Sequence, residues 1–386
     1  MVDAPRTPAL EWVHDVAPQL AARAAEIERT KRLPPEVLDL LHEGGMFRLL
    51  LPRWLDGAEL GVRDFALVME ALAAVDASTA WCVCQAAACA MAAAYVDRES
   101  AVEVFGAPRS VLAWGPDTGT HAVVVDGGYV VSGRWSYVSG IHHATWLGGS
   151  CRLFEPDGTP RRTAAGAQEI RTVLFPAEHA TVEEVWDTLG LRGTGTDSFT
   201  VTDLFVPDRL SFARDDPSAW HDPASLYCFS HSNVFSAGFA AVVLGIARGA
   251  LDAFVALARD KTPLGRERAL RDSPPVQMEV ARLEGRLRAA RAFLFSVLDE
   301  AWHEATGDGA LSDKSKLAIR LAASHAFAEA PAILDRAYHG AGITAVFTGS
   351  EFERRLRDLH TATQQFQGRD EHFETVGRSL LGTDRA

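Results

Sequence analysis

The chain has 386 residues, of which 47% are hydrophobic and 23% are charged, so it holds enough apolar surface for a folded core and is not a wholly disordered protein. Acidic residues outnumber basic ones by 51 to 38, which gives a formal net charge of −13. Proteins that bind nucleic acid usually carry a basic domain or stripe, and because none is visible we expect no nucleic-acid partner.

The first part of the chain, to about residue 105, has a helical pattern. Leu33-Pro34-Pro35-Glu36 predicts a helix start, because the missing proline N–H costs nothing there, and Gly44-Gly45 predicts its end. Asp76 to Thr79 predicts the cap of an alanine-rich helix. We assign residues 1–108 to an N-terminal α-helical domain.

The middle of the chain is predicted to be β-structure. Val123 to Val125 and Tyr129 to Val131 flank Asp126-Gly127-Gly128, and Asp-Gly between β-branched runs is a strong hairpin signal. Further strand patterns follow at 172–175, 180–186 and 199–206. We assign residues 109–214 to a central β-domain.

Helical periodicity returns from Ser225 onward. Apolar residues spaced alternately by three and four form the seam of a long helix, namely Val276, Val280, Leu283, Leu287, Ala290, Leu294 and Val297. We assign residues 215–386 to a C-terminal helical bundle. A β-domain between helical domains predicts a crevice where a small molecule binds.

Two uncharged stretches, Ala77 to Val96 and Pro223 to Ala247, are long enough to span a membrane. Both contain polar residues such as Gln85 and His231, so we interpret them as buried helices and expect no membrane partner. The N-terminus lacks the pattern of a secretory signal. The five cysteines have no zinc-like spacing, which favours free thiols in a cytoplasmic protein and no metal site.

Motif searching finds no self-sufficient catalytic signature, since Walker, GxGxxG, GxSxG and HExxH patterns are missing from the sequence. The run Gly193-Thr194-Gly195-Thr196 lies between predicted strands, which favours a turn over a phosphate cradle. His142 and His143 are neighbours on a predicted strand and would point to opposite faces, which disfavours one shared metal ion.

Several segments together resemble the acyl-CoA dehydrogenase fold, in order and over nearly the whole chain. They are 33–52, 76–81, 127–129, the run Gly133-Arg134-Trp135-Ser136-Tyr137-Val138-Ser139-Gly140, 143–146, 189–198, 206–207, 244–250 and 355–358. The resemblance implies an α+β protein with an N-terminal helical domain, a central β-barrel or sandwich domain and a C-terminal four-helix bundle.

The form of the run from Gly133 to Gly140 is similar to that of two-component flavin monooxygenases, such as the oxygenase components of 4-hydroxyphenylacetate hydroxylase and dibenzothiophene monooxygenase. This resemblance implies that a separate reductase supplies reduced FMN or FAD. A C4a-hydroperoxyflavin then forms with molecular oxygen, and one oxygen atom is inserted into a small organic substrate. The family's habit of building flavin sites across subunits implies a homotetramer.

Acyl-CoA dehydrogenases need a carboxylate base, which in many members follows the Arg-Asp pair by about eight residues. Here that region reads Gln364-Gln365-Phe366-Gln367-Gly368-Arg369, and the second family position, near Phe235, also lacks a carboxylate. The monooxygenases often have a histidine where Gln365 stands. We therefore expect Gln365 to donate a hydrogen bond, with proton handling left to His142, His231 or His360.

The same resemblance assigns roles to the β-domain run. Ser139 and Gly140 would lie against the N5/O4 edge of the flavin, with Ser139 donating a hydrogen bond and Val138 beside them. Trp135 and Tyr137, on one strand face, would wall the isoalloxazine, or else pack in the β-domain core.

Roles outside this run follow in the same way. Trp81 and Trp114 would line the substrate crevice, although tryptophans are commonly core residues. Arg259 and Lys261, with the turn glycines Gly340 and Gly342, would reach the flavin phosphate of a neighbouring subunit; a solvated basic face and a helix end are the alternatives. Arg357 and Asp358 would form a structural ion pair.

Three functions thus stay open: a reduced-flavin monooxygenase, a flavin dehydrogenase of acyl-CoA type with a displaced base, and a flavin-binding scaffold without turnover. The sequence favours the first, because the amides at 364, 365 and 367 cannot act as a carbon-acid base.

Overall fold

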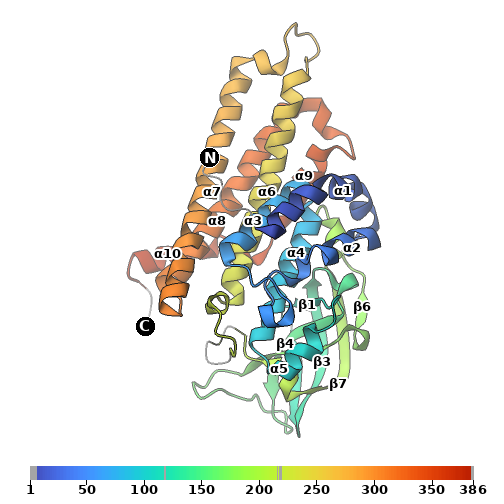
Figure 1. The fold of residues 1–386 in the computed structure, drawn as a ribbon, viewed down its shortest axis with the longest axis vertical. Helices are drawn as coiled ribbons and strands as arrows, with labels where there is room; N and C mark the ends of the chain where they lie inside the picture. The colour runs from blue at the N-terminus through green and yellow to red at the C-terminus, as the bar shows by residue number, and fades with distance from the viewer. Residues whose placement is uncertain (1–6, 117–118, 215, 217–219, 384–386) are drawn as a thin grey trace.

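The computed structural model describes residues 7–116, 119–214, 216 and 220–383. Its helices are α1 (Pro8–Thr30), α2 (Pro35–Glu43), α3 (Val62–Val75), α4 (Ala77–Ala90), α5 (Arg98–Phe105), α6 (His231–Asp260), α7 (Pro274–Asp308), α8 (Asp313–Ala341), α9 (Glu351–Ala362) and α10 (Glu371–Leu380). Its strands are β1 (Leu112–Gly115), β2 (His121–Val125), β3 (Gly128–Val138), β4 (Trp146–Phe154), β5 (Ile170–Pro176), β6 (Thr181–Glu183), β7 (Asp197–Pro207) and β8 (Ser211–Phe212). The predicted α+β order of helices, strands and helices is confirmed (Figure 1).

The predicted helix ends rest on local chemistry. Asp76 caps α4, since its Oδ1 accepts from the Thr79 N–H at 2.8 Å and from the Thr79 hydroxyl at 2.7 Å. Pro35 opens α2 and Gly44 follows its last residue. These caps are the ones that the sequence predicts, because capping depends on residues close in the chain.

The strands form one mixed sheet in the order β6-β7-β3-β2-β4-β5-β8, with β1 pairing beside β4. The predicted hairpin is β2–β3, in which Val124 pairs with Tyr129 across the Asp126-Gly127 turn. Phe175 of β5 meets Phe199 of β7 edge to face with ring centres 5.9 Å apart. These strands are not neighbours in the sheet, so the contact shows that the sheet curls. The central domain is therefore a single curled sheet in which β5 and β7 face each other, and the predicted fold class is confirmed.

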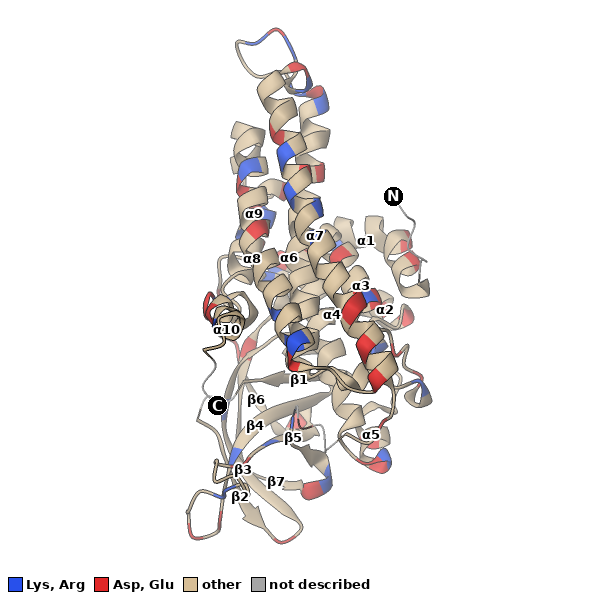
Figure 2. Cartoon of the chain, turned by 90° about the vertical axis from the view of Figure 1, so that its left-hand side faces the viewer, with Lys and Arg blue, Asp and Glu red and all other residues tan. Residues whose placement is uncertain are grey.

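The C-terminal helices form the predicted bundle of α6, α7, α8 and α9, which rises from the sheet in Figure 1. Helix α3 of the N-terminal part packs along α6, so the two helical regions share one core. Figure 2 shows acidic and basic residues interspersed along the bundle face that it presents.

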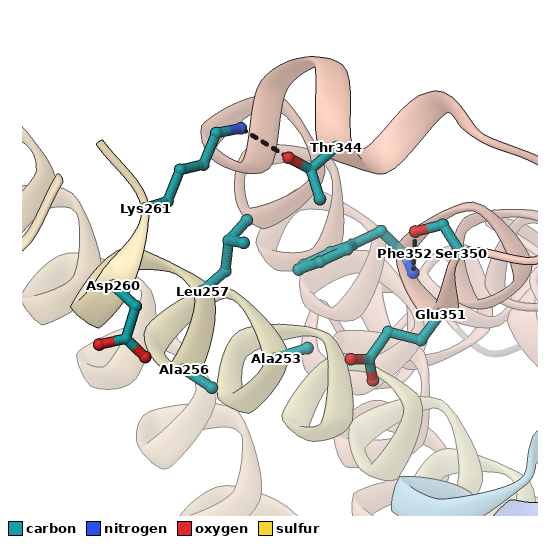
Figure 3. Close-up of a pocket in the computed structure, with 9 residues that line it drawn as sticks. All are labelled: Ala253, Ala256, Leu257, Asp260, Lys261, Thr344, Ser350, Glu351 and Phe352. Atoms are coloured by element: carbon teal, nitrogen blue, oxygen red, sulfur yellow. Dashed lines mark hydrogen bonds between the residues drawn. The ribbon is translucent and has the colours of Figure 1, made fainter. Parts of the chain in front are cut away.

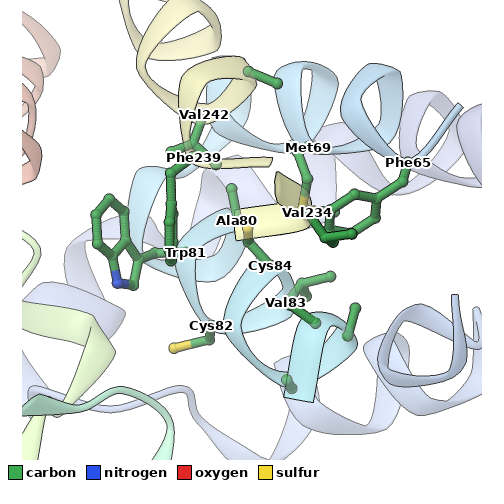
Figure 4. Close-up of a cluster of buried hydrophobic side chains, with 14 of the residues drawn as sticks. Phe65, Met69, Ala80, Trp81, Cys82, Val83, Cys84, Val234, Phe239 and Val242 are labelled. Atoms are coloured by element: carbon green, nitrogen blue, oxygen red, sulfur yellow. The ribbon is translucent and has the colours of Figure 1, made fainter. Parts of the chain in front are cut away.

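Among the described residues, three helical stretches are long and apolar enough to cross a membrane by length and composition: Ala77–Ala94, His231–Asp260 and Asp313–Val346. The most apolar windows of these stretches are 94%, 67% and 50% buried within the fold. Figure 4 shows the α4 part of this core, where Trp81, Cys84 and Val83 pack beside α3 and α6 side chains such as Phe65 and Phe239.

Candidate active site at the junction of sheet and bundle

Ser139 follows the last residue of β3 and faces α4. Its Oγ accepts the indole N–H of Trp81 at 3.1 Å and lies 2.8 Å from the Thr196 hydroxyl. The side chain is almost fully buried, at 5% exposure. Gly140 comes next with φ +79°, a backbone conformation that favours glycine, and a Cβ there would lie 2.8 Å from Nε2 of His143. Three separate elements therefore meet at the Ser139 hydroxyl.

The loop that carries Thr196 is held tightly against the helices. It contains a short 3-10 turn, Arg192–Thr194, and the Thr194 carbonyl accepts the Gly140 N–H at 3.0 Å. A Cβ on Gly193 would lie 2.1 Å from Ile27 Cγ2 of α1 and 3.0 Å from the Ser78 Cβ of α4. The run Gly193 to Thr196 is thus the predicted turn, and it is buried against two helices.

His142 is oriented by a buried carboxylate. Its Nε2 lies 2.7 Å from Oδ2 of Asp197, and Oδ1 of Asp197 accepts the backbone N–H groups of Val185 at 2.6 Å and Trp186 at 2.7 Å. Asp197 directly follows Thr196, so the contact to His142 and the contact to Ser139 come from neighbouring residues of one segment.

His143 has a different environment. It packs on Phe47 with ring centres 5.3 Å apart, and burial lowers its pKa to about 3, so the ring is neutral at physiological pH. The two histidines lie on a 3-10 turn, Ile141–His143, in place of the predicted strand. Within the described part of the chain, no three His, Cys, Asp or Glu residues gather closely enough to hold a metal ion.

An aromatic cluster lies above Ser139, between the sheet and the start of α6. The Trp81 ring packs on Phe239 at 4.1 Å between centres, Phe239 stacks on Phe235, and Phe235 meets Trp114 edge to face. His231, the first residue of α6, lies 5.2 Å from the Trp114 ring. Trp81, Trp114 and His231, predicted from distant parts of the sequence, therefore belong to one buried cluster.

Comparison with known proteins shows which family this chain belongs to. Residues 11–99 match the acyl-CoA dehydrogenase N-terminal domain and residues 237–369 match the acyl-CoA dehydrogenase C-terminal domain. An indole-3-acetate monooxygenase from Pseudomonas putida is 30% identical over 94% of this chain and 90% of its own length. The chain belongs to the acyl-CoA dehydrogenase family.

A further relative is named as a flavin-dependent monooxygenase, and two solved structures have a similar fold. The flavin-dependent monooxygenase oxygenase subunit HsaA of Rhodococcus jostii is 29% identical, over 89% of this chain and 90% of its own length. Among solved structures, the 3-HSA hydroxylase of Rhodococcus sp. RHA1 has a TM-score of 0.91 at 24% identity and covers 99% of both chains. XiaF of Streptomyces, solved with FADH2 and glycerol, has a TM-score of 0.89 at 26% identity, covering 97% of this chain and 95% of its own.

In this member of the acyl-CoA dehydrogenase family, the two aromatic residues predicted to wall the isoalloxazine, Trp135 and Tyr137, do not lie on the same face of β3. Trp135 is fully buried in the β-domain, where it stacks on Phe199 at 5.0 Å and donates its indole N–H to the Ser150 carbonyl at 3.1 Å. Tyr137 is 67% exposed and has φ +60°. The β3–β7 pairing is irregular between Trp135 and Val138, and this bulge breaks the alternation of side chains. Trp135 is thus a core residue and the shared wall prediction is wrong, whereas Val138 is buried beside Ser139.

The glutamine segment also differs from the prediction. Gln365 precedes a 3-10 turn, Phe366–Gly368, and its Oε1 accepts the Gln367 N–H at 2.5 Å, so its carbonyl caps the turn. Gln367 is the buried amide, with Oε1 2.6 Å from the Ser236 hydroxyl on α6. Ser236 follows Phe235 of the aromatic cluster. The interior amide is therefore two residues beyond the predicted one.

The predicted phosphate-binding residues lie at the opposite end of α6. This helix has 30 residues, about 45 Å at 1.5 Å per residue, so its end is too far from Ser139 to bind the same FMN molecule within one chain. Arg259 is exposed there, and a Cβ on Gly340 would lie 2.4 Å from the Phe254 ring. Gly342 ends α8 with φ +59°.

Lys261 borders an open groove of about 560 Å³ at this distal end (Figure 3). Its ammonium donates to the Ala341 carbonyl at 2.5 Å and to the Thr344 hydroxyl at 2.8 Å. Asp260 and Glu351 line the same groove. Lys261 thus holds the turn after α8 through these two hydrogen bonds.

The predicted ion pair between Arg357 and Asp358 does not form. Arg357 lies 2.5 Å from Glu28 and also pairs with Glu353, whereas Asp358 accepts the Leu191 N–H at 2.6 Å. Burial raises the pKa of the Asp358 carboxyl to about 7. Asp358 therefore anchors the loop that carries Thr194 and Thr196 to α9.

This anchor makes stability depend on pH. The native pKa of Asp358 exceeds its ordinary value of 3.8, so between pH 4 and 7 the native state binds more protons than the unfolded state, and its stability falls as pH rises. We expect Asp358→Asn to remove this contribution while keeping an oxygen for the Leu191 N–H. Between pH 4.5 and 8 the wild-type protein should lose about 3 kcal/mol of unfolding free energy through this carboxyl, and urea unfolding should show that the variant does not lose it. Equal pH slopes for the two proteins would contradict the assignment.

Sequence reasoning missed Thr194, Thr196, Asp197 and Gln367. The glycines of the Gly-Thr-Gly-Thr-Asp run predict only a turn. Two hydroxyls and a carboxylate beside turn glycines were the available signal.

Proposed function

We propose that this protein is the oxygenase component of a two-component flavin monooxygenase. It would bind reduced FMN or FAD from a separate reductase and insert one oxygen atom into a small organic substrate. The observation that carries this proposal is the buried Ser139 hydroxyl, held by Trp81 and Thr196 beneath an aromatic cluster, in a chain whose relatives are named monooxygenases.

The residues at Ser139 fit a flavin. Where Ser139 donates to Thr196 and accepts from Trp81, its hydroxyl oxygen has one lone pair left for a flavin atom. Bound reduced flavin would supply the chemistry that activates dioxygen. Ser139 would orient the flavin edge, and Trp81, Trp114 and Phe235 would exclude water from a flat apolar substrate. His142, oriented by Asp197, is the candidate for moving a proton.

The dehydrogenase alternative needs a free carboxylate near the substrate. Gln367 faces α6 with an amide, and Asp197 is occupied by His142 and two backbone N–H groups. These contacts favour oxygenation over proton abstraction from an acyl thioester.

Stopped-flow spectroscopy tests this function. Protein mixed with reduced FMN or FAD and then with oxygen is expected to show a transient absorbance distinct from those of reduced and oxidised flavin, outlasting any seen with flavin alone. Bleaching of protein-bound oxidised flavin by an acyl-CoA under anaerobic conditions, with no such transient, would favour the dehydrogenase.

We further propose a homotetramer in the cytoplasm. Because Arg259 and Lys261 lie so far from Ser139 within one chain, a phosphate contact by either residue requires a second copy. Exposed Ile343 and Phe347 beside the distal groove give that end an apolar surface. Light scattering should give about four times the chain mass of 41.8 kDa. A monomer that still binds reduced flavin would contradict the tetramer.

The free cysteines support the proposed cytoplasmic location, because thiols stay reduced in that compartment.

A further inference from the structure

A chain of three hydroxyl groups runs away from the candidate flavin edge. Ser139 Oγ lies 2.8 Å from Thr196 Oγ1, which lies 2.6 Å from Thr194 Oγ1, and Thr194 Oγ1 lies 2.8 Å from the Leu191 carbonyl oxygen. All three hydroxyl residues are buried, at 5%, 6% and 2% exposure in that order. Inside a protein such contacts are strong and cannot be exchanged freely with water.

The direction of these hydrogen bonds is fixed by the carbonyl at the end. A carbonyl oxygen only accepts, so Thr194 must donate its single proton to Leu191. Thr196 therefore donates to Thr194, and Ser139 donates to Thr196. On its other side Ser139 accepts the Trp81 indole N–H. Its remaining lone pair can only accept a further hydrogen bond.

The end of the chain is itself held in place. The Leu191 carbonyl also accepts the Trp186 indole N–H at 2.9 Å, and the Leu191 N–H is held by Asp358 at 2.6 Å. The Thr194 carbonyl accepts the Gly140 N–H. The Leu191 carbonyl accepts the Thr194 backbone N–H at 3.1 Å as well. If the hydroxyls reversed their direction, no proton would lie between Thr194 Oγ1 and the Leu191 oxygen, and two acceptor oxygens would face each other at 2.8 Å, which is unfavourable.

We propose that Thr196 and Thr194 are positioning residues that make Ser139 an obligate acceptor, and that the site thereby selects reduced over oxidised flavin. Resting on the proposed function, this inference concerns the flavin N5 atom at Ser139. N5 carries a hydrogen in reduced flavin and is a donor, whereas in oxidised flavin it is an acceptor. An acceptor-only Ser139 bonds the first and opposes the second. This reverses the donor role predicted for Ser139 from the sequence.

Equilibrium binding of reduced and oxidised FMN under anaerobic conditions tests this inference. Wild-type protein should bind reduced FMN more tightly. In Thr196→Val the Ser139 proton is released and can donate to oxidised N5, so the preference should fall about tenfold, mainly through tighter binding of oxidised FMN. The midpoint potential of bound FMN should fall by about 30 mV for a tenfold change.

Three further variants separate the effect of hydrogen-bond direction from the effect of altered side-chain packing. Thr194→Val, one link farther away, should lower the preference in the same direction, and it serves if Thr196→Val does not fold. Thr196→Ser should keep the wild-type preference. Thr172→Val, a matched buried substitution on β5, should leave it unchanged.

An unchanged preference in both valine variants, or equal weakening of both flavin forms, would overturn the inference. Wild-type protein that binds neither form of FMN or FAD would instead overturn the proposed function, and the two failures are thus distinguishable.

Discussion

Gly190→Ala is expected to lower the free energy of unfolding by about 3 kcal/mol, the upper part of the range for inserting a group into a packed interior. A Cβ at this position would lie 2.1 Å from the Arg357 carbonyl oxygen and 2.5 Å from the Asp358 N. Both are backbone atoms of α9, which cannot move aside as a flexible side chain can. The loop must shift instead, and Leu191 would lose its bond to Asp358. Urea denaturation measures the loss.

The matched control for this substitution is Gly285→Ala in α7. Nothing lies within 4 Å of a Cβ there, so alanine should stabilise the helix by about 0.5–1 kcal/mol. Reduced-flavin binding should weaken in Gly190→Ala and stay unchanged in Gly285→Ala. If both variants unfold at the wild-type urea concentration, the loop does not dock on α9 as described.

Gln367→Leu is expected to slow oxygen transfer roughly 100-fold, within the range for losing a preorganised polar group at an active site. Gln367 is buried and contacts Ser236, next to the aromatic cluster, so leucine removes the amide at nearly constant volume. Gln365→Ala, in contrast, should change oxygen transfer less than about threefold and cost about 1 kcal/mol of stability, as for loss of a cap.

Single-turnover kinetics with saturating reduced flavin would measure the rate of oxygen transfer in both glutamine variants. Thermal unfolding of each variant separates slower chemistry from lost structure. If Gln365→Ala slows oxygen transfer strongly and Gln367→Leu does so only slightly, Gln365 is the active-site amide, and its replacement by Gln367 in this role is wrong.

The features that the sequence predicts well depend on neighbours in the chain. The Asp76 cap needs only Thr79, and the β2–β3 turn needs only Asp126 and the residues around it. Such local signals, repeated in the expected order, were sufficient for the fold class.

The site was harder to predict, because its contacts join distant segments. Ser139 and Thr196 are 57 residues apart, and Leu191 and Asp358 are 167 apart. Tyr137 shows a second limit, since its positive φ lies at a bulge that strand periodicity does not reveal. The same bulge separates Trp135 from Tyr137, which strict alternation would place on one face.

Two carboxylates fasten the segment from Val185 to Asp197, one at its start and one in its middle. Asp197 holds the backbone N–H groups of Val185 and Trp186, and Asp358 holds that of Leu191. The number of residues between these anchors consequently sets where the Ser139 contact falls. This segment should tolerate exchanges of side chain along its exposed part but no insertion or deletion, which makes its length a more useful guide to related sequences than its composition.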